Sequence, residues 1–125
     1  MIMKILVIED DTFLSSLISS ELEQSGYEVL SAFDGKQGIE MAKTHPDVIL
    51  LDLIMPGMDG FETLTALKAD PATAPIPVVV ASNLGEREEI KRAKDAGAID
   101  FLVKVHFTPK EIVAKIRTLV PEVHP

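Results

Sequence analysis

The sequence predicts one α/β domain, residues 1–125, built on a parallel β-sheet, and three observations support this fold class. Four short runs are rich in branched aliphatic residues and apolar without alternation, as expected for strands covered on both faces: KILVIED, DVILLD, PVVVAS and DFLVKV. Segments with the apolar period of helices separate these runs. A length of 125 residues suits a single domain that buries its own core.

Each element has its own sequence signal. The run YEVLSA is shorter and more polar than the other four, which predicts an edge strand. The first helix should run to about Ser25, where Gly26 stops it, and the last should begin with Thr108 as N-cap and Pro109 in its first turn. The residues expected on the apolar faces of these two helices are Phe13, Leu14, Leu17, Ile18 and Leu22, and then Ile112, Val113, Ile116, Leu119 and Val120. Weaker helical patterns cover residues 36–44, 61–68 and 86–96.

Strand and helix therefore alternate five times along the chain, which is typical of a doubly wound sheet with right-handed crossovers. Five strands and five helices of these lengths fit the flavodoxin-like strand order 2-1-3-4-5.

Composition narrows the classes of function. The chain has no cysteine, which excludes disulfides, thiolate metal sites and thiol nucleophiles. The net charge is −8, and residues 1–85 hold thirteen of the twenty acids but four of the twelve Lys and Arg residues. This bias argues against a nucleic-acid surface there and for a cation or a basic partner, although a solvated acidic face is the commoner explanation of net charge.

No segment of the sequence predicts export or membrane insertion. The apolar run at the amino end is too short for a signal peptide, and no run elsewhere is long enough to cross a bilayer. We therefore expect a cytoplasmic protein.

Polar residues gather where the predicted strands end. Glu9, Asp10 and Asp11 follow the first strand, Asp52 the third, Ser82 and Asn83 the fourth, and Lys104 the fifth. In a parallel sheet these ends share one edge, where ligands of open α/β sheets bind. The strands that carry Glu9 and Asp52 should flank the switch point of the sheet.

This set of residues favours phosphoryl chemistry. Carboxylates without histidine or cysteine suit a hard cation, most plausibly Mg²⁺, and without a cation their repulsion should raise a pKa or loosen the site. Lys104 and Ser82 would neutralise and orient a phosphoryl group, with Asp52 as the nucleophile. Each residue alone is better explained as a turn former, a surface lysine or a satisfied hydroxyl, but independent turn formers are not expected to share one edge.

Four motifs carry a resemblance over essentially the whole chain. They are ILVIEDD, DLIMPGMDG, the hydroxyl residue five positions after the proline of PVVVAS, and the lysine of DFLVK. In this order and spacing they resemble the receiver domain of response regulators in two-component signalling, in particular stand-alone regulators of the chemotaxis type.

The resemblance implies roles for individual residues. Asp52 would accept a phosphoryl group from a histidine on a sensor kinase or phosphotransfer protein. Mg²⁺ would be held by Asp52, by Asp10 directly, by Glu9 through water and by the main-chain carbonyl of Ile54. Asp11 occupies a more variable position of the family.

The same resemblance implies a switch. Ser82 would follow the phosphate, and Phe101 would swing into the space behind it; core packing is the alternative explanation of Phe101. The loop residues Gly57 and Gly60 are expected to serve backbone turns.

Two positions depart from the family pattern. The family usually has proline after the lysine, where this chain has Val105, and we predict a trans bond there because a cis bond before a non-proline residue costs about 2.5–4 kcal/mol. The positions that influence the attacking water hold the apolar residues Ile54 and Leu84, from which we predict slow self-dephosphorylation.

The leading hypothesis is a regulator that catalyses only its own phosphorylation and dephosphorylation. It would signal to a protein target or output domain through the face formed by the fourth helix, fifth strand and fifth helix, with no nucleic-acid or membrane contact and with a phosphorylation-dependent dimer left open. Basic residues on that face suit an acidic partner: Arg87, Lys91, Lys94, Lys110, Lys115 and Arg117.

Three alternatives remain. A Mg²⁺-dependent phosphohydrolase is disfavoured because Ile54 stands where such enzymes have a second aspartate. A static adaptor that takes no phosphate is disfavoured because every core residue is present. The chain is also compatible with a fragment of a longer regulator or hybrid kinase.

Overall fold

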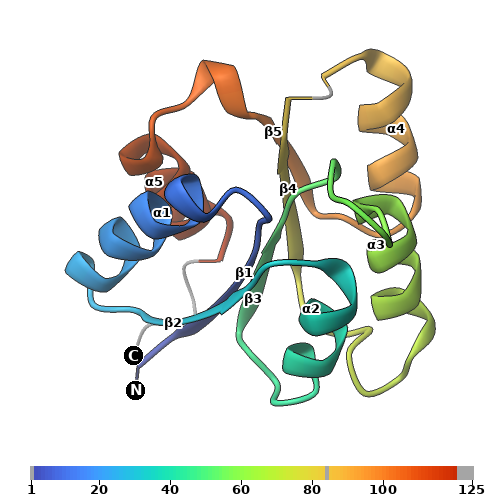
Figure 1. The fold of residues 1–125 in the computed structure, drawn as a ribbon, viewed down its shortest axis with the longest axis horizontal. Helices are drawn as coiled ribbons and strands as arrows, with labels where there is room; N and C mark the ends of the chain where they lie inside the picture. Colours follow the sequence, from blue (N-terminus) through green and yellow to red (C-terminus); the bar gives the residue numbers. More distant parts are fainter. Residues whose placement is uncertain (1, 84, 121–125) are drawn as a thin grey trace.

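The computed structural model describes residues 2–83 and 85–120. Within these residues five parallel strands form one sheet in the order β2-β1-β3-β4-β5, as the sequence predicts (Figure 1). The strands are β1 (Lys4–Ile8), β2 (Glu28–Ala32), β3 (Val48–Leu51), β4 (Val78–Ser82) and β5 (Asp100–Val103).

Helices cover both faces of the sheet. In the described part of the chain they are α1 (Thr12–Gln24), α2 (Gly35–Ala42), α3 (Gly60–Ala69), α4 (Arg87–Asp95) and α5 (Pro109–Leu119), and a 3-10 turn (Lys104–His106) follows β5. Figure 1 shows α1 and α5 on one side of the sheet and α2, α3 and α4 on the other. None of these helices is long and apolar enough to span a bilayer.

Each face of the sheet has its own apolar core. Successive residues of a strand point to opposite faces, so Leu6 and Ile8 pack in the cluster beneath α2, α3 and α4, whereas Ile5 and Val7 pack in the cluster beneath α1 and α5. Every residue of β3 and β4 is buried, which explains their unbroken apolar sequences. In β2 one residue is buried, three are half-buried and one is exposed, as expected of an edge strand.

Side-chain caps fix the starts of the helices. Thr108 caps α5 and forms a reciprocal capping box with Glu111, with Pro109 in the first turn. Asp11 caps α1, where its side chain accepts hydrogen bonds of 3.0 Å from the main-chain N–H groups of Phe13 and Leu14. The predicted bounds of α2, α3 and α4, the predicted end of α1 and the predicted start of α5 are confirmed to within one or two residues.

The predicted apolar face of α1 is only partly correct. Ile18 and Leu22 are buried and Leu14 is half-buried, but Phe13 is 72% exposed and Leu17 is 41% exposed. The small residue Ser15 lies inward instead. The apolar stripe read from the sequence is wider than the surface that α1 presents to the sheet and to α5, so its outer members remain in solvent.

The bond between Lys104 and Val105 is trans, as predicted, and no peptide bond within the described residues is cis. The chain leaves β5 through the 3-10 turn, and this places Val105 at the surface with 74% of its area exposed.

Candidate functional site

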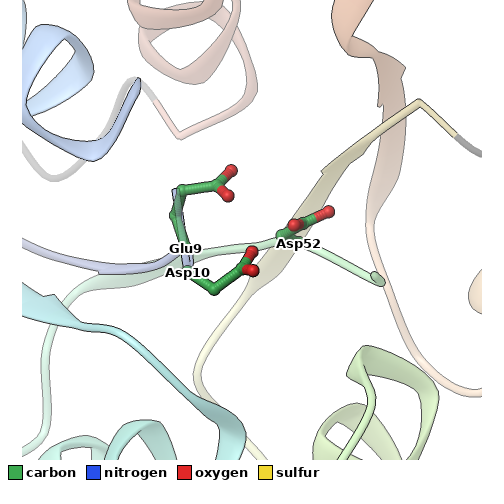
Figure 2. A group of neighbouring side chains, drawn as sticks. All are labelled: Glu9, Asp10 and Asp52. Atoms are coloured by element: carbon green, nitrogen blue, oxygen red, sulfur yellow. The ribbon is translucent and has the colours of Figure 1, made fainter. Parts of the chain in front are cut away.

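Three carboxylates meet where two adjacent strands end. β1 and β3 pair in parallel, with Ile8 opposite Leu51, so the residues that follow them lie side by side. Glu9, Asp10 and Asp52 each offer an oxygen, and these oxygens lie within 4.8 Å of one another. Figure 2 shows the three side chains projecting from the two strand ends into the same region.

Main-chain hydrogen bonds hold two of these residues in line with the sheet. The N–H of Asp52 donates to the carbonyl of Ile8 over 3.0 Å, and the N–H of Glu9 donates to the carbonyl of Ala32 over 3.0 Å. The ladder therefore continues one residue past the strands on both sides, and the sheet rather than a loop sets the positions of Glu9 and Asp52.

The cluster is buried at one side and open at the other. Glu9 is 3% exposed and Asp52 is 5% exposed, whereas Asp10 is half-buried. An ion or a phosphoryl group would therefore reach Asp52 from the side on which Asp10 lies.

Lys104 supplies the positive charge inside the cluster. Its side chain is 12% exposed, and its ammonium donates a hydrogen bond to Oε1 of Glu9 and lies 3.4 Å from Oδ2 of Asp52. It is therefore not a surface lysine, and the two buried carboxylates have a counter-charge from the turn after β5, 95 positions from Glu9 in the sequence.

Burial dominates the ionisation of these acids. It raises the pKa of Glu9 to about 7; the hydrogen bond from Lys104 opposes this rise and the nearby charge of Asp52 adds to it. Burial also raises the pKa of Asp52, against the charge of Lys104 and the main-chain N–H of Ile54. The predicted upward shift is confirmed in direction, but loss of water contributes more to it than repulsion between the acids.

The remaining predicted site residues differ in their burial and in their contacts with this cluster. Ser82 ends β4 and is completely buried, and Phe101 on β5 is 9% exposed within the apolar cluster beneath α4. Ile54 is 53% exposed, and its main-chain N–H donates a hydrogen bond of 3.3 Å to Oδ1 of Asp52.

Asp11 is not among the acids whose oxygens converge, because its carboxylate caps α1. Asn83 is exposed, and Leu84 lies outside the described residues.

A comparison with family models decides the identity of the domain. The model described as "Response regulator receiver domain" matches residues 5–117. The chain belongs to this receiver family.

Curated relatives of this receiver domain are longer proteins. The DNA-binding dual master transcriptional regulator RpaA of Synechocystis is 41% identical over 117 residues, which cover 93% of this chain and 48% of that protein. The phosphate regulon regulatory protein PhoB of Escherichia coli is 35% identical over 123 residues, covering 98% of this chain and 53% of that protein. The chain thus spans about half the length of these relatives.

Solved receiver structures match over nearly their full length. Chemotaxis protein CheY4 of Vibrio cholerae superposes with a TM-score of 0.88 at 28% identity, covering 95% of this chain and 99% of that one. The receiver domain of the Francisella response regulator 1452 superposes with a TM-score of 0.85 at 30% identity, covering 96% of this chain and 98% of that one. The Mn(2+)-bound form of response regulator Rcp1 superposes with a TM-score of 0.83 at 26% identity, covering 93% of this chain and 92% of that one.

One residue that positions the receiver site has a role that the sequence analysis missed. Gly57 serves a turn as predicted, with φ of +75°, but Gly60 opens α3 with no need for a positive φ. A Cβ at Gly60 would lie 2.3 Å from both the carbonyl oxygen of Asp52 and the Cα of Leu53. Gly60 is therefore required because α3 starts against the backbone that follows β3, and the only sequence signal of this contact was its place beside the predicted start of a helix.

The donor set of the receiver site fits a hard divalent cation. All three converging side chains offer carboxylate oxygens, and no softer nitrogen or sulfur ligand belongs to the group found in the described residues. Exposed acidic clusters without an ion are common, but two members of this one are almost fully buried.

Proposed function

We propose that this receiver domain accepts a phosphoryl group on Asp52 from a phosphohistidine of a sensor kinase or phosphotransfer protein. The observation that carries the proposal is the carboxylate of Asp52, which is 5% exposed, lies 3.4 Å from the ammonium of Lys104 and converges with the carboxylates of Glu9 and Asp10. An acid that only caps a helix or forms a turn at a strand end needs neither this burial nor a nearby ammonium and two further carboxylates.

The transfer requires positioning more than covalent help from other residues. An oxygen of Asp52 attacks phosphorus, the bond between phosphorus and the donor imidazole nitrogen breaks, and the leaving imidazole retains that electron pair and takes up a proton. Lys104 would exchange Glu9 for an oxygen of the incoming phosphoryl group, since its ammonium already lies next to Oδ2 of Asp52. In self-dephosphorylation, water attacks phosphorus, the bond between phosphorus and the Asp52 oxygen breaks, and inorganic phosphate leaves while Asp52 is regenerated as a carboxylate. The domain would therefore act catalytically only on itself.

The residues present fit Mg²⁺. We propose that Asp10 and Asp52 bind it through their carboxylates, Glu9 through water, and Ile54 through its main-chain carbonyl. The ion would supply neutralisation of charge on the phosphoryl oxygens. The similar regulator Rcp1 was solved in an Mn(2+)-bound form, which supports binding of a divalent cation by this domain.

We further propose that the output passes through β4 and β5. Ser82 ends β4, which pairs with β3, and lies opposite Val103 of β5; Phe101 on β5 packs in the cluster that the half-buried Ile90 of α4 also joins. Movement of the Ser82 hydroxyl toward the phosphoryl group would then reach α4 through this packing. Phe101 is already buried here, so a rearrangement within the core suits it better than a swing from solvent.

The output partner is proposed from charge. The exposed lysines and arginines of α4 and α5 suit an acidic surface on a target protein or output domain, in the cytoplasm. RpaA and PhoB are transcriptional regulators by name, which supports a signalling output without assigning DNA contact to this chain.

Mass spectrometry after treatment with acetyl phosphate and Mg²⁺ tests the acceptor. We expect the wild type to gain one phosphoryl group, Asp52→Asn to gain none, and the control Asp95→Asn on exposed α4 to behave as wild type. Equal labelling of Asp52→Asn would refute the assignment, and an unlabelled wild type would favour a static adaptor. Repeated turnover of a phosphate monoester would favour the hydrolase, whereas turnover of acetyl phosphate would not, because self-dephosphorylation also releases its phosphate.

A further inference from the structure

One edge of the sheet is left partly uncovered. Two helices, α1 and α5, lie on one side of the sheet, against three helices on the other (Figure 1). β2 is the outermost strand next to α1, and of its residues only Ala32 is buried. The face of β2 on the α1 side therefore has room for a further element.

A groove of about 330 Å³ lies at this place between α1 and β2. Hydroxyl side chains dominate its walls: Thr12, Ser15, Ser16, Ser19 and Ser31. These side chains are too small to fill the space between helix and strand. The hydroxyl oxygens of Ser19 and Ser31 lie 3.5 Å apart, at the upper limit for a hydrogen bond. Phe33, which is 41% exposed, gives the groove an apolar end.

The surroundings of the groove are strongly acidic. Residues 9–34 contain no lysine, arginine or histidine, and their seven acids are Glu9, Asp10, Asp11, Glu21, Glu23, Glu28 and Asp34. Among the ion pairs found in the described residues, only those of Glu9 and Glu28 involve this segment, and both take their lysine from outside it. Glu23 lines the groove itself. The negative charge around the groove is therefore largely uncompensated within the domain.

We propose that this groove is the docking site of a basic amphipathic helix from a partner protein. Its lining extends along α1 from Thr12 to Glu23, about 17 Å or three helical turns. A helix of this length would complete the layer formed by α1 and α5, place an apolar side chain against Phe33, and direct lysine or arginine toward Glu23 and the neighbouring acids. The docked helix would lie beside the carboxylate cluster, because Thr12 and Phe33 follow the strand ends that border it. The proposal does not depend on phosphorylation of Asp52.

Amide chemical-shift mapping of the full chain tests the site with two synthetic helical peptides. One peptide carries leucine on one face and lysine on the other, and the second has glutamate in place of each lysine. We expect the lysine peptide to shift amides of Thr12–Gln24 and Glu28–Phe33, with affinity that falls as salt rises, and the glutamate peptide to leave them unchanged. Shifts centred on α4 and α5, or no shifts at all, would overturn the proposal.

Three variants separate shape from charge. Ser16→Trp obstructs the groove without changing charge, and Glu23→Lys reverses the charge of the acid that lines it; each should weaken binding of the lysine peptide by about tenfold or more. The control Glu40→Lys makes the same change of charge on α2, on the opposite side of the sheet, and should alter affinity by less than about twofold. An equal loss in the control would show unspecific attraction, and full binding by Ser16→Trp would show that the groove is not used. Either result overturns the proposal, and unchanged melting curves confirm that each variant is folded.

Discussion

Glu9 and Asp52 owe their chemical character to residues that are distant in the sequence. Two carboxylates with less than a tenth of their surface exposed would lose much hydration on folding, and the ammonium of Lys104 offsets part of that cost. One lysine cannot balance three acids, so the site keeps an excess of negative charge. This excess is what a divalent cation would neutralise.

The raised pKa of Glu9 predicts a pH dependence of stability in the absence of divalent cations. Its pKa rises from 4.5 to about 7 on folding, so its contribution to stability is fully present below pH 4.5 and is lost as pH rises through 7. In urea unfolding with EDTA, the free energy of unfolding of Glu9→Gln should rise relative to that of the wild type between pH 5 and 8, by an amount on the order of 2 kcal/mol. A difference that stays constant over this range would contradict the shift.

Ile54 predicts a long-lived phosphoryl group. Its side chain is 53% exposed and cannot orient or deprotonate an attacking water, so the phosphorylated protein should persist well beyond seconds. Ile54→Asn should shorten the lifetime by about tenfold, whereas Ile54→Val should leave it unchanged. The decay of radiolabelled protein measures this, and loss of label within seconds from the wild type would refute the prediction.

At the scale of elements, the start of α3 depends on two glycines for different reasons. Gly60→Ala would force α3 away from the backbone of Asp52 and should lower the free energy of unfolding by about 2–3 kcal/mol. Gly57→Ala meets no atom within 4 Å and pays only for its φ of +75°, about 1 kcal/mol. Chemical denaturation of both variants compares the two effects, and equal losses would show that the close approach at Gly60 is relieved without strain.

The helix α4 is the least firmly packed of the helices in the described residues. Ala93 is its only buried residue, and its N-cap Glu86 makes no side-chain capping bond. Arg92, whose guanidinium lies 3.9 Å from the ring centroid of Phe61, and Lys94, 4.0 Å from Asp100, connect it to α3 and β5. A helix held by surface contacts can shift at low cost, which suits the proposed output.

On the scale of the whole molecule, the strand order determines where the carboxylates meet. β1 and β3 are neighbours although β2 lies between them in the sequence, so the chain reverses its winding at this pair. Helices on either side diverge from such a switch point and leave its edge open for a ligand.

Binding of Mg²⁺ to the folded state alone should stabilise the entire domain. At a concentration 100 times the dissociation constant the gain is about 2.7 kcal/mol, which thermal unfolding with and without Mg²⁺ measures. Asp10→Asn should reduce this gain strongly, because it removes the half-buried carboxylate at the open side of the cluster. The control Asp95→Asn should keep it, and an undiminished gain in Asp10→Asn would argue against the proposed ligand.

Much of this architecture is readable from local patterns. Unbroken apolar runs predict β3 and β4 because both faces of a central parallel strand are covered, and Thr108 with Pro109 predicts the start of α5 because helix caps act within a few residues. The gathering of Glu9, Asp52 and Lys104 at one edge follows from the parallel direction of the strands. These features depend on period, on near neighbours or on strand direction, all of which a sequence contains.

Other features arise only when distant elements pack together. Phe13 remains in solvent because the inner surface of α1 is narrower than its apolar stripe, and Gly60 is needed because α3 begins against another segment of backbone. The pKa of Glu9 depends chiefly on how much water the folded chain removes from it. Such properties come from the shape of the space between elements, and that shape exists only after the chain has folded.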